Sequence, residues 1–243
     1  MKFGVQLYNF RKYLAEDFKG TMKEIAKIGF DGVEYAFNFG EMEPEEIASF
    51  TKEIGLECCG MMFSDQLLSN PENNAWNYAK ALNPPTISIS ETVDFSQKWQ
   101  EILDICLVIQ KNAEAKGFLF SYHNHWAEYD LADGIPAMYR ILDALGAEKI
   151  FVEPDVCWLS SAGMDPASYI RKYGSRIKQV HFKDNLEPKN PKSTVSLGNG
   201  IVDLKAAFAA VKEINAQWLI YEQDTSNDPF KDASDSLAFM KSL

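Results

Sequence analysis

Residues 150–155 read IFVEPD, in which three apolar residues in succession precede Glu153, Pro154 and Asp155. A run that is apolar at successive positions turns neither face to water, which is typical of a strand buried in a parallel sheet. Residues 218–222, WLIYE, repeat this pattern near the end of the chain and also end in a carboxylate. We therefore expect a parallel sheet whose two faces are both covered.

Segments of helical periodicity separate these strand-like runs. Residues 17–29, DFKGTMKEIAKIG, place Met22, Ile25, Ala26 and Ile28 on one side of a helix and stop at a glycine. The strand-like segments start about 24 to 40 residues apart, which is the spacing of βα units. The expected strands are residues 3–8, 32–37, 56–62, 86–90, 118–124, 150–155, 177–184 and 217–224.

Eight such units in 243 residues predict one α/β domain, a (β/α)8 TIM barrel over residues 1–243. A doubly wound open sheet is the alternative fold. Its dinucleotide-binding form is disfavoured because no GxGxxG motif follows the first strand. We find no low-complexity segment or Gly/Ser linker that would divide the chain.

Composition excludes several classes of protein. The formal charge of −11 disfavours a nucleic-acid partner, which normally requires a basic surface. No apolar run approaches the roughly 20 residues of a membrane span, and the chain enters its first strand without the apolar region of a signal peptide. The four cysteines show no paired metal-binding spacing. Reduced thiols in a cytoplasmic protein are the simplest expectation.

Polar residues gather where the expected strands end. In TIM barrels the active site lies at the C-terminal ends of the strands. A single acidic residue after a strand is commonly a turn former or a helix cap. Here, however, all three histidines of the chain and several carboxylates share this position, which favours a functional cluster. These residues are His123, His125, Glu128, Glu153, Asp155, His181, Lys183, Glu222 and Asp224.

Three of these residues predict a metal site. Asp155, His181 and Glu222 end the sixth, seventh and eighth strands, so their side chains would approach one point near the barrel axis. Imidazole with carboxylates and without cysteine suits Mn²⁺, Zn²⁺, Co²⁺ or Fe²⁺ and gives Ca²⁺ little advantage. We therefore expect one divalent metal ion, with a fourth ligand from the fifth strand.

Five segments together resemble the xylose-isomerase-like superfamily, which includes sugar isomerases and epimerases, inosose dehydratases and type IV apurinic endonucleases. The resemblance covers essentially the whole chain. It implies a barrel that holds a divalent metal through Glu, Asp, His and Glu from strands five to eight, with Asp155, His181 and Glu222 as the last three ligands. The segments are YHNHWAEY (122–129), DVCWLSSAGMDP (155–166), RIKQVHFKD (176–184), LGNGIVD (197–203) and YEQD (221–224).

The first metal ligand departs from the family pattern. Where related enzymes often have LENH, this chain has YHNH, which puts His123 at the place of the glutamate. Either His123 binds the metal, or Glu128 folds back from the loop to do so. We favour Glu128, because a third carboxylate helps to neutralise the dication and leaves His123 and His125 for proton transfer.

Other residues are candidates for substrate contact. Trp158 would stack on a sugar ring or pack at the rim. Lys183 would steady an enolate oxygen or bind a substrate hydroxyl, with a structural salt bridge to Asp184 or Glu153 as the alternative. Gln6, Arg11 and Glu34 are expected substrate contacts from the first two strands.

The expected activity is metal-dependent isomerisation or epimerisation of a keto-sugar or sugar phosphate. A proton next to a carbonyl would be removed to form a metal-stabilised enediolate and then returned. A lyase or dehydratase acting on an inosose or 3-keto-glycoside is the alternative, since loss of a hydroxyl or glycosyl group can follow the same step. A non-catalytic sugar-binding barrel and an endonuclease rank lower.

The expected partner is a small sugar or cyclitol. Whether this partner is phosphorylated, and whether the chain forms a homo-oligomer, stay open. The expected catalytic residues are His123, His125, Lys183 and Glu222.

Overall fold

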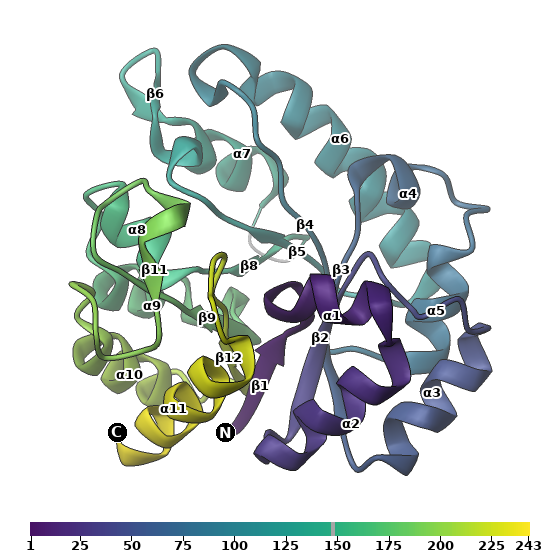
Figure 1. Ribbon diagram of the computed structural model, residues 1–243. Coiled ribbons are helices and arrows are strands. Elements are labelled where there is room, and N and C mark those ends of the chain that lie inside the picture. Colours follow the sequence, from purple (N-terminus) through teal and green to yellow (C-terminus); the bar gives the residue numbers. More distant parts are fainter. Residues whose placement is uncertain (147–148) are drawn as a thin grey trace.

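The computed structural model describes residues 1–146 and 149–243 and confirms the expected (β/α)8 barrel. Eight parallel strands form one sheet in the order β8-β5-β4-β3-β2-β1-β12-β9, and helices surround it (Figure 1). The strands are β1 (Lys2–Gln6), β2 (Gly32–Ala36), β3 (Glu57–Met62), β4 (Ile87–Ile89), β5 (Phe120–His123), β8 (Phe151–Glu153), β9 (Gln179–Phe182) and β12 (Trp218–Tyr221). Each lies within or close to one of the eight segments that the sequence predicts.

The barrel closes between β8 and β9 through isolated pairings rather than through a continuous ladder. Val152 pairs with Ile177, and Asp155 pairs with His181, both in parallel orientation. The backbone N–H of His181 also donates to the carbonyl of Pro154 at 2.9 Å. This closing seam therefore runs directly beside two of the expected metal ligands.

The helices follow from amphipathic segments with ordinary caps. In α2 the Asp17 side chain accepts a hydrogen bond from the backbone N–H of Gly20, and the helix ends at Gly29, whose φ is 97°. The C-terminal helix α11 packs against α2 and β1, so both ends of the chain lie at the same side of the barrel (Figure 1). The helices are α1 (Arg11–Glu16), α2 (Phe18–Ile28), α3 (Pro44–Glu53), α4 (Asp65–Ser69), α5 (Ala75–Leu82), α6 (Phe95–Lys116), α7 (Ala137–Leu145), α8 (Val156–Ser161), α9 (Pro166–Tyr173), α10 (Leu204–Glu213) and α11 (Pro229–Ser242).

Two small antiparallel hairpins extend from the loops after β5 and β9. They pair β6 (Leu131–Ala132) with β7 (Ile135–Pro136), and β10 (Asp184–Asn185) with β11 (Thr194–Val195). None of the described helices combines the length and the apolar character that a bilayer-spanning segment requires.

The barrel interior is apolar at one end and polar above it. Cys59, Trp218 and Ile220 form a buried cluster that is separate from the main core between sheet and helices. Above this cluster, Gly60 leaves room for a buried carboxylate, because a Cβ on Gly60 would collide with Glu34. A layer of polar side chains at this depth is unusual in a TIM barrel, whose interior is dominated by branched apolar residues.

Candidate metal centre and active site

Four side chains converge at the C-terminal end of the barrel. One donor atom of each lies within 4.8 Å of the donor atoms of the others, and all four residues are buried. His123 is the last residue of β5, Asp155 caps α8 directly after β8, His181 lies in β9, and Glu222 follows β12. The structure thus brings together the three ligands expected from strands six to eight and adds His123.

The donor atoms suit a transition-metal dication. The Oδ1 atom of Asp155 accepts hydrogen bonds from the backbone N–H groups of Cys157 and Trp158 at 2.9 and 3.0 Å. Its Oδ2 atom accepts no hydrogen bond from the described residues and lies 3.1 Å from the ammonium of Lys183. The Nδ1 atom of His123 also has no hydrogen-bond partner among them. Burial, reinforced by the nearby His181, lowers the pKa of His123 well below its usual value, which favours the neutral imidazole that a metal requires. Two imidazoles with two carboxylates suit Zn²⁺, Mn²⁺, Co²⁺ or Fe²⁺, and binding would require His181, whose pKa is raised, to release a proton.

His181 is held from two sides. Its Nδ1 lies 2.6 Å from Glu222 Oε2, and its Nε2 lies 2.6 Å from Glu34 Oε2 and 3.4 Å from Glu153 Oε1. Burial by itself would lower the pKa of His181, but Glu34 and Glu153 raise it well above its usual value. The contacts with Glu222 on one side and Glu34 on the other fix the orientation of the imidazole ring.

Glu34 lies beneath the centre and does not line the cavity above it. The residue is 0% exposed, and it accepts hydrogen bonds from Gln6 Nε2 at 2.7 Å and from Gln179 Nε2 at 3.3 Å. Burial, together with the charge of Glu153, raises the pKa of Glu34 to about 8. Glu34, expected as a substrate contact, therefore does not line the cavity and contacts His181 instead.

Lys183 is a fully buried cation among three carboxylates. Its Nζ lies 3.1 Å from Asp155 Oδ2, 3.2 Å from Glu222 Oε2 and 3.1 Å from Asp224 Oδ2. Burial opposes the charge, but the carboxylates raise the pKa of Lys183 well above its usual value. Among the described residues, the ion pair expected with Asp184 or Glu153 is not formed; Lys183 instead pairs with Asp155, Glu222 and Asp224, the first two of which belong to the four-donor group.

Glu128 contacts His125 rather than the four-donor group. The Nδ1 atom of His125 lies 3.7 Å from Glu128 Oε1 and 3.1 Å from the Ser90 hydroxyl. Glu128 is fully buried, and neither of its carboxylate oxygens has a hydrogen-bond partner among the described residues. Burial would lower the pKa of His125, but Glu128 raises it. The two rings of His123 and His125 lie edge to face with centroids 5.4 Å apart.

A cavity of about 250 Å³ opens above these groups. Phe37, at its edge, is 54% exposed and has a φ of 59°, a left-handed conformation that is uncommon for an aromatic residue and that often marks a functional site. The cavity combines apolar walls with a few convergent polar groups, as small-molecule sites do. Its lining residues are Gln6, Tyr8, Ala36, Phe37, Met62, Ser90, Thr92, His123, His125, Glu222 and Asp224.

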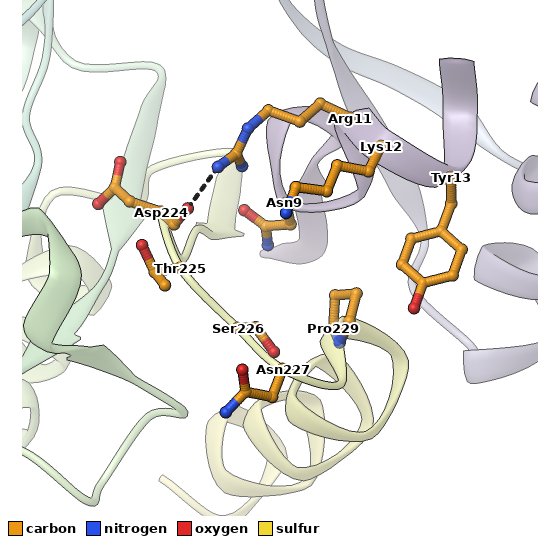
Figure 2. A pocket seen from close by; sticks show the side chains of 9 residues that line it. All are labelled: Asn9, Arg11, Lys12, Tyr13, Asp224, Thr225, Ser226, Asn227 and Pro229. Carbon is orange, nitrogen blue, oxygen red and sulfur yellow. Dashed lines mark hydrogen bonds between the residues drawn. The ribbon is translucent and has the colours of Figure 1, made fainter. Parts of the chain in front are cut away.

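The other expected substrate contacts have different positions. Gln6 lines the cavity. Trp158 does not: it is 1% exposed and lies beneath Lys183, whose Nζ is 4.8 Å from the ring centroid. Arg11 lines a neighbouring cavity, where it donates a hydrogen bond to the backbone carbonyl of Asp224 (Figure 2).

Four residues that the structure places in the site have no individual role predicted from the sequence. Asp224 and Glu153 lie at strand ends, two residues from the expected ligands Glu222 and Asp155. Residues two apart on a strand share a face, so this spacing could have identified them. Ser90 ends the fourth expected strand, where only its position could have indicated a role. Nothing in the sequence around Phe37 signals its left-handed backbone.

The comparisons with known proteins agree with this fold. A family model described as xylose isomerase-like TIM barrel matches residues 22–243. The chain belongs to this family. Residues 22–243 include all four converging donors, so the family match and the site coincide in the chain.

Individual relatives are distant and extend over nearly the whole chain. The chain is 23% identical to an inosose dehydratase from Salmonella typhimurium over 88% of its length and 83% of that protein. A sugar phosphate isomerase/epimerase structure from Parabacteroides distasonis aligns with a TM-score of 0.84 at 17% identity, covering 100% of this chain and 99% of that one. A structure described as IOLI protein with a bound zinc atom aligns with a TM-score of 0.78 at 14% identity, covering 100% and 98%. At these identities the structural likenesses establish the fold.

Proposed function

We propose that the protein is a divalent-metal-dependent isomerase or epimerase of a small sugar-like ketone. The observation that supports this most strongly is the convergence of His123, Asp155, His181 and Glu222. Two of these donors, His123 and Glu222, line a cavity that His125 also lines. Pure sugar binding would give no reason to collect four metal-type donors at one point.

His123, Asp155, His181 and Glu222 would hold the metal, and the zinc in the structurally similar IOLI protein is consistent with such a centre. When bound, a divalent cation polarises a carbonyl and stabilises the negative charge that develops as a neighbouring C–H proton leaves. Glu34 would support the centre by fixing the ring of His181, since outer partners of ligating histidines tune metal affinity.

His125 would transfer the proton. Its imidazole lies at the cavity surface, and the Glu128 carboxylate behind it holds the ring and stabilises its charged form. Lys183 would hold the Asp155, Glu222 and Asp224 carboxylates in place from below the cavity.

Dehydration is the second candidate, because the inosose dehydratase relative matches 88% of the chain. The two reactions share removal of a proton next to a carbonyl and differ in the fate of the resulting enediolate. In an isomerase the proton returns to carbon; in a dehydratase a β-hydroxyl leaves and water is lost.

The test is a metal analysis of the purified protein combined with a screen of keto-sugars and inososes in D₂O. Deuterium incorporation at carbon without loss of water would support the isomerase, and an unsaturated or deoxy product would support the dehydratase. A metal-loaded protein that catalyses neither reaction on any of these ketones would contradict both candidates.

A further inference from the structure

A second cavity of about 240 Å³ lies beside the first, between the residues after β1 and those after β12. Figure 2 shows the side chains of Arg11 and Lys12 running alongside each other toward the segment 224–227. The lining residues are Asn9, Arg11, Lys12, Tyr13, Asp224, Thr225, Ser226, Asn227 and Pro229.

The guanidinium of Arg11 is held in place without being neutralised. Its Nη1 donates to the carbonyl of Tyr8 and its Nη2 to the carbonyl of Asp224, both at 2.8 Å. Its carbon Cζ lies 4.0 Å from the centroid of the Tyr8 ring. Backbone carbonyls and an aromatic ring orient a cation but supply no compensating charge, so Arg11 keeps its full positive charge at a fixed position.

No carboxylate neutralises the cation pair. Among residues 1–146 and 149–243, no carboxylate lies within ion-pair distance of Arg11 or Lys12. Asp224 is the one acidic residue that lines the cavity; its carboxylate points away from Arg11 in Figure 2, and its Oδ2 lies 3.1 Å from Lys183 Nζ. In a chain with a net charge of −11, two adjacent unpaired cations in a cavity form a local site for an anion.

A buried donor adds to the two cations. The Asn9 side chain accepts a hydrogen bond from the backbone N–H of Gln223 at 2.9 Å, which fixes the amide. Its Nδ2 is then left without a hydrogen-bond partner among the described residues, although the atom is buried and its residue lines the cavity. An unpartnered donor is costly to bury, and an oxygen of a bound anion would satisfy it once the Asn9 side chain turns toward the cavity.

This cavity and the catalytic cavity share a wall. Asp224 lines both, and the Tyr8 ring that supports Arg11 lines the catalytic cavity. A substituent that extends from a ligand in the catalytic cavity past Asp224 would therefore reach Arg11 and Lys12.

We propose that Arg11, Lys12 and Asn9 form a subsite for an anionic substituent of the substrate, a phosphate ester or a carboxylate. Arginine recognises both groups through charge-assisted hydrogen bonds. This assignment rests on the proposed function, because it describes a substituent of the same sugar-like ketone.

Binding of simple anions tests the subsite independently of turnover. Orthophosphate and acetate are titrated calorimetrically into the purified wild-type protein, into the Arg11→Gln/Lys12→Gln variant and into Lys23→Gln/Lys80→Gln. The last removes the same charge from exposed positions outside both cavities. We expect the wild type and the Lys23/Lys80 control to bind at least one anion equally, and Arg11→Gln/Lys12→Gln to bind it about tenfold more weakly or worse. The anion that binds identifies phosphate or carboxylate as the source.

A second experiment tests whether the anion belongs to the substrate. Fructose is compared with fructose 6-phosphate, and fructose with fructuronate, in the D₂O exchange reaction. We expect the anionic member of a pair to have the lower KM in the wild type, and Arg11→Gln/Lys12→Gln to remove that advantage with little change in kcat. Equal anion binding by wild type and Arg11→Gln/Lys12→Gln would overturn the subsite. Anion binding without a preference for the anionic sugar would overturn its assignment to the substrate. If no sugar exchanges at all, the proposed function fails while the titrations still decide whether the anion site exists.

Discussion

His123 and Glu128 lie five residues apart, and the structure gives them different neighbours. His123 joins Asp155, His181 and Glu222, whereas Glu128 lies 3.7 Å from His125. The sequence favours Glu128 as the ligand, but the turn after β5 decides where Glu128 points, and one sequence does not display that turn. The short helical turn over Ala127–Tyr129 brings Glu128 beneath His125.

The first prediction separates proton transfer from metal binding. His125→Gln and Glu128→Gln should both keep the metal, because neither side chain belongs to the four-donor group. His125→Gln should lose about 10²- to 10⁴-fold in deuterium exchange, since an amide cannot shuttle protons near neutral pH. Glu128→Gln should lose less, because the imidazole remains. Metal content by atomic emission and exchange rates by NMR decide this; loss of metal from Glu128→Gln would restore Glu128 as a ligand.

The second prediction concerns Glu34, which contacts His181 at 2.6 Å. Glu34→Ala should weaken metal binding about 10- to 100-fold, because the ring of His181 loses the partner that orients it. Glu34→Gln should lose much less, since its amide oxygen can still accept from the imidazole N–H. Competition with a chelator measures the affinities, and urea unfolding of both variants checks that the fold persists. Equal metal affinity in Glu34→Ala and wild type would remove Glu34 from the centre.

At the scale of elements, the loop between β4 and α6 contains an acid whose ionisation opposes folding. Burial, with Asp65 and Glu128 nearby, raises the pKa of Glu91 to about 7. The unfolded chain loses this proton near pH 4.5, while the folded chain keeps it until about pH 7. Stability that is present below pH 4.5 is therefore lost as the pH rises through this window.

Glu91→Gln should accordingly match the wild type in stability at pH 4 and exceed it at pH 8. Urea unfolding at the two pH values measures the difference, and Glu72→Gln at an exposed position between α4 and α5 is the control. A Glu91→Gln variant that is no more stable than wild type at pH 8 would show that the carboxylate is accommodated without cost.

The periodicity of apolar residues predicts the helices and strands better than it predicts which side chains contact one another across the barrel. The eight strands are predictable because buried parallel strands are apolar on both faces, and the helices because their apolar residues repeat at helical spacing. The hairpins β6–β7 and β10–β11 are not, since strands of two residues are too short to show a period. Contacts across the barrel, such as Glu34 with His181, depend on the register between strands, which one sequence does not display.

Within the site, the two-residue spacing is informative. Lys183 directly follows the strand that contains His181, and Glu222 and Asp224 follow β12. Lys183 lies 3.1 Å from Asp224 and 3.2 Å from Glu222, as expected for side chains that share a face. Trp158 is harder to place, because it lies one helical turn after Asp155. Whether such a residue faces the cavity or the core depends on the direction of α8, and here it is buried.

At the scale of the whole molecule, a bound metal would link strands at the seam where isolated pairings replace a continuous backbone ladder. The seam between β8 and β9 has only isolated pairings among the described residues, and one of them joins Asp155 to His181. A cation bound by both residues, and by His123 and Glu222, would link four strands across this seam.

Zn²⁺ or Mn²⁺ at about 100 times its Kd should therefore stabilise the protein by about 2.7 kcal/mol, which raises Tm by about 5 to 10 °C. Ca²⁺ is the matched control ion and should have little effect, because it prefers oxygen donors. Thermal unfolding of chelated protein with each ion measures the shifts. Equal shifts with Ca²⁺ and the transition metals would mean that the ions act on surface carboxylates.

The central claim is that one divalent ion, bound by His123, Asp155, His181 and Glu222, supports proton exchange. Its most direct test is metal content per chain, measured beside deuterium exchange, for wild type, His181→Ala, Glu222→Ala and the control His125→Gln. We predict one ion per chain in wild type and in His125→Gln, and loss of both metal and exchange in His181→Ala and Glu222→Ala, provided that circular dichroism shows them folded. Undiminished metal content in folded His181→Ala and Glu222→Ala would contradict the account.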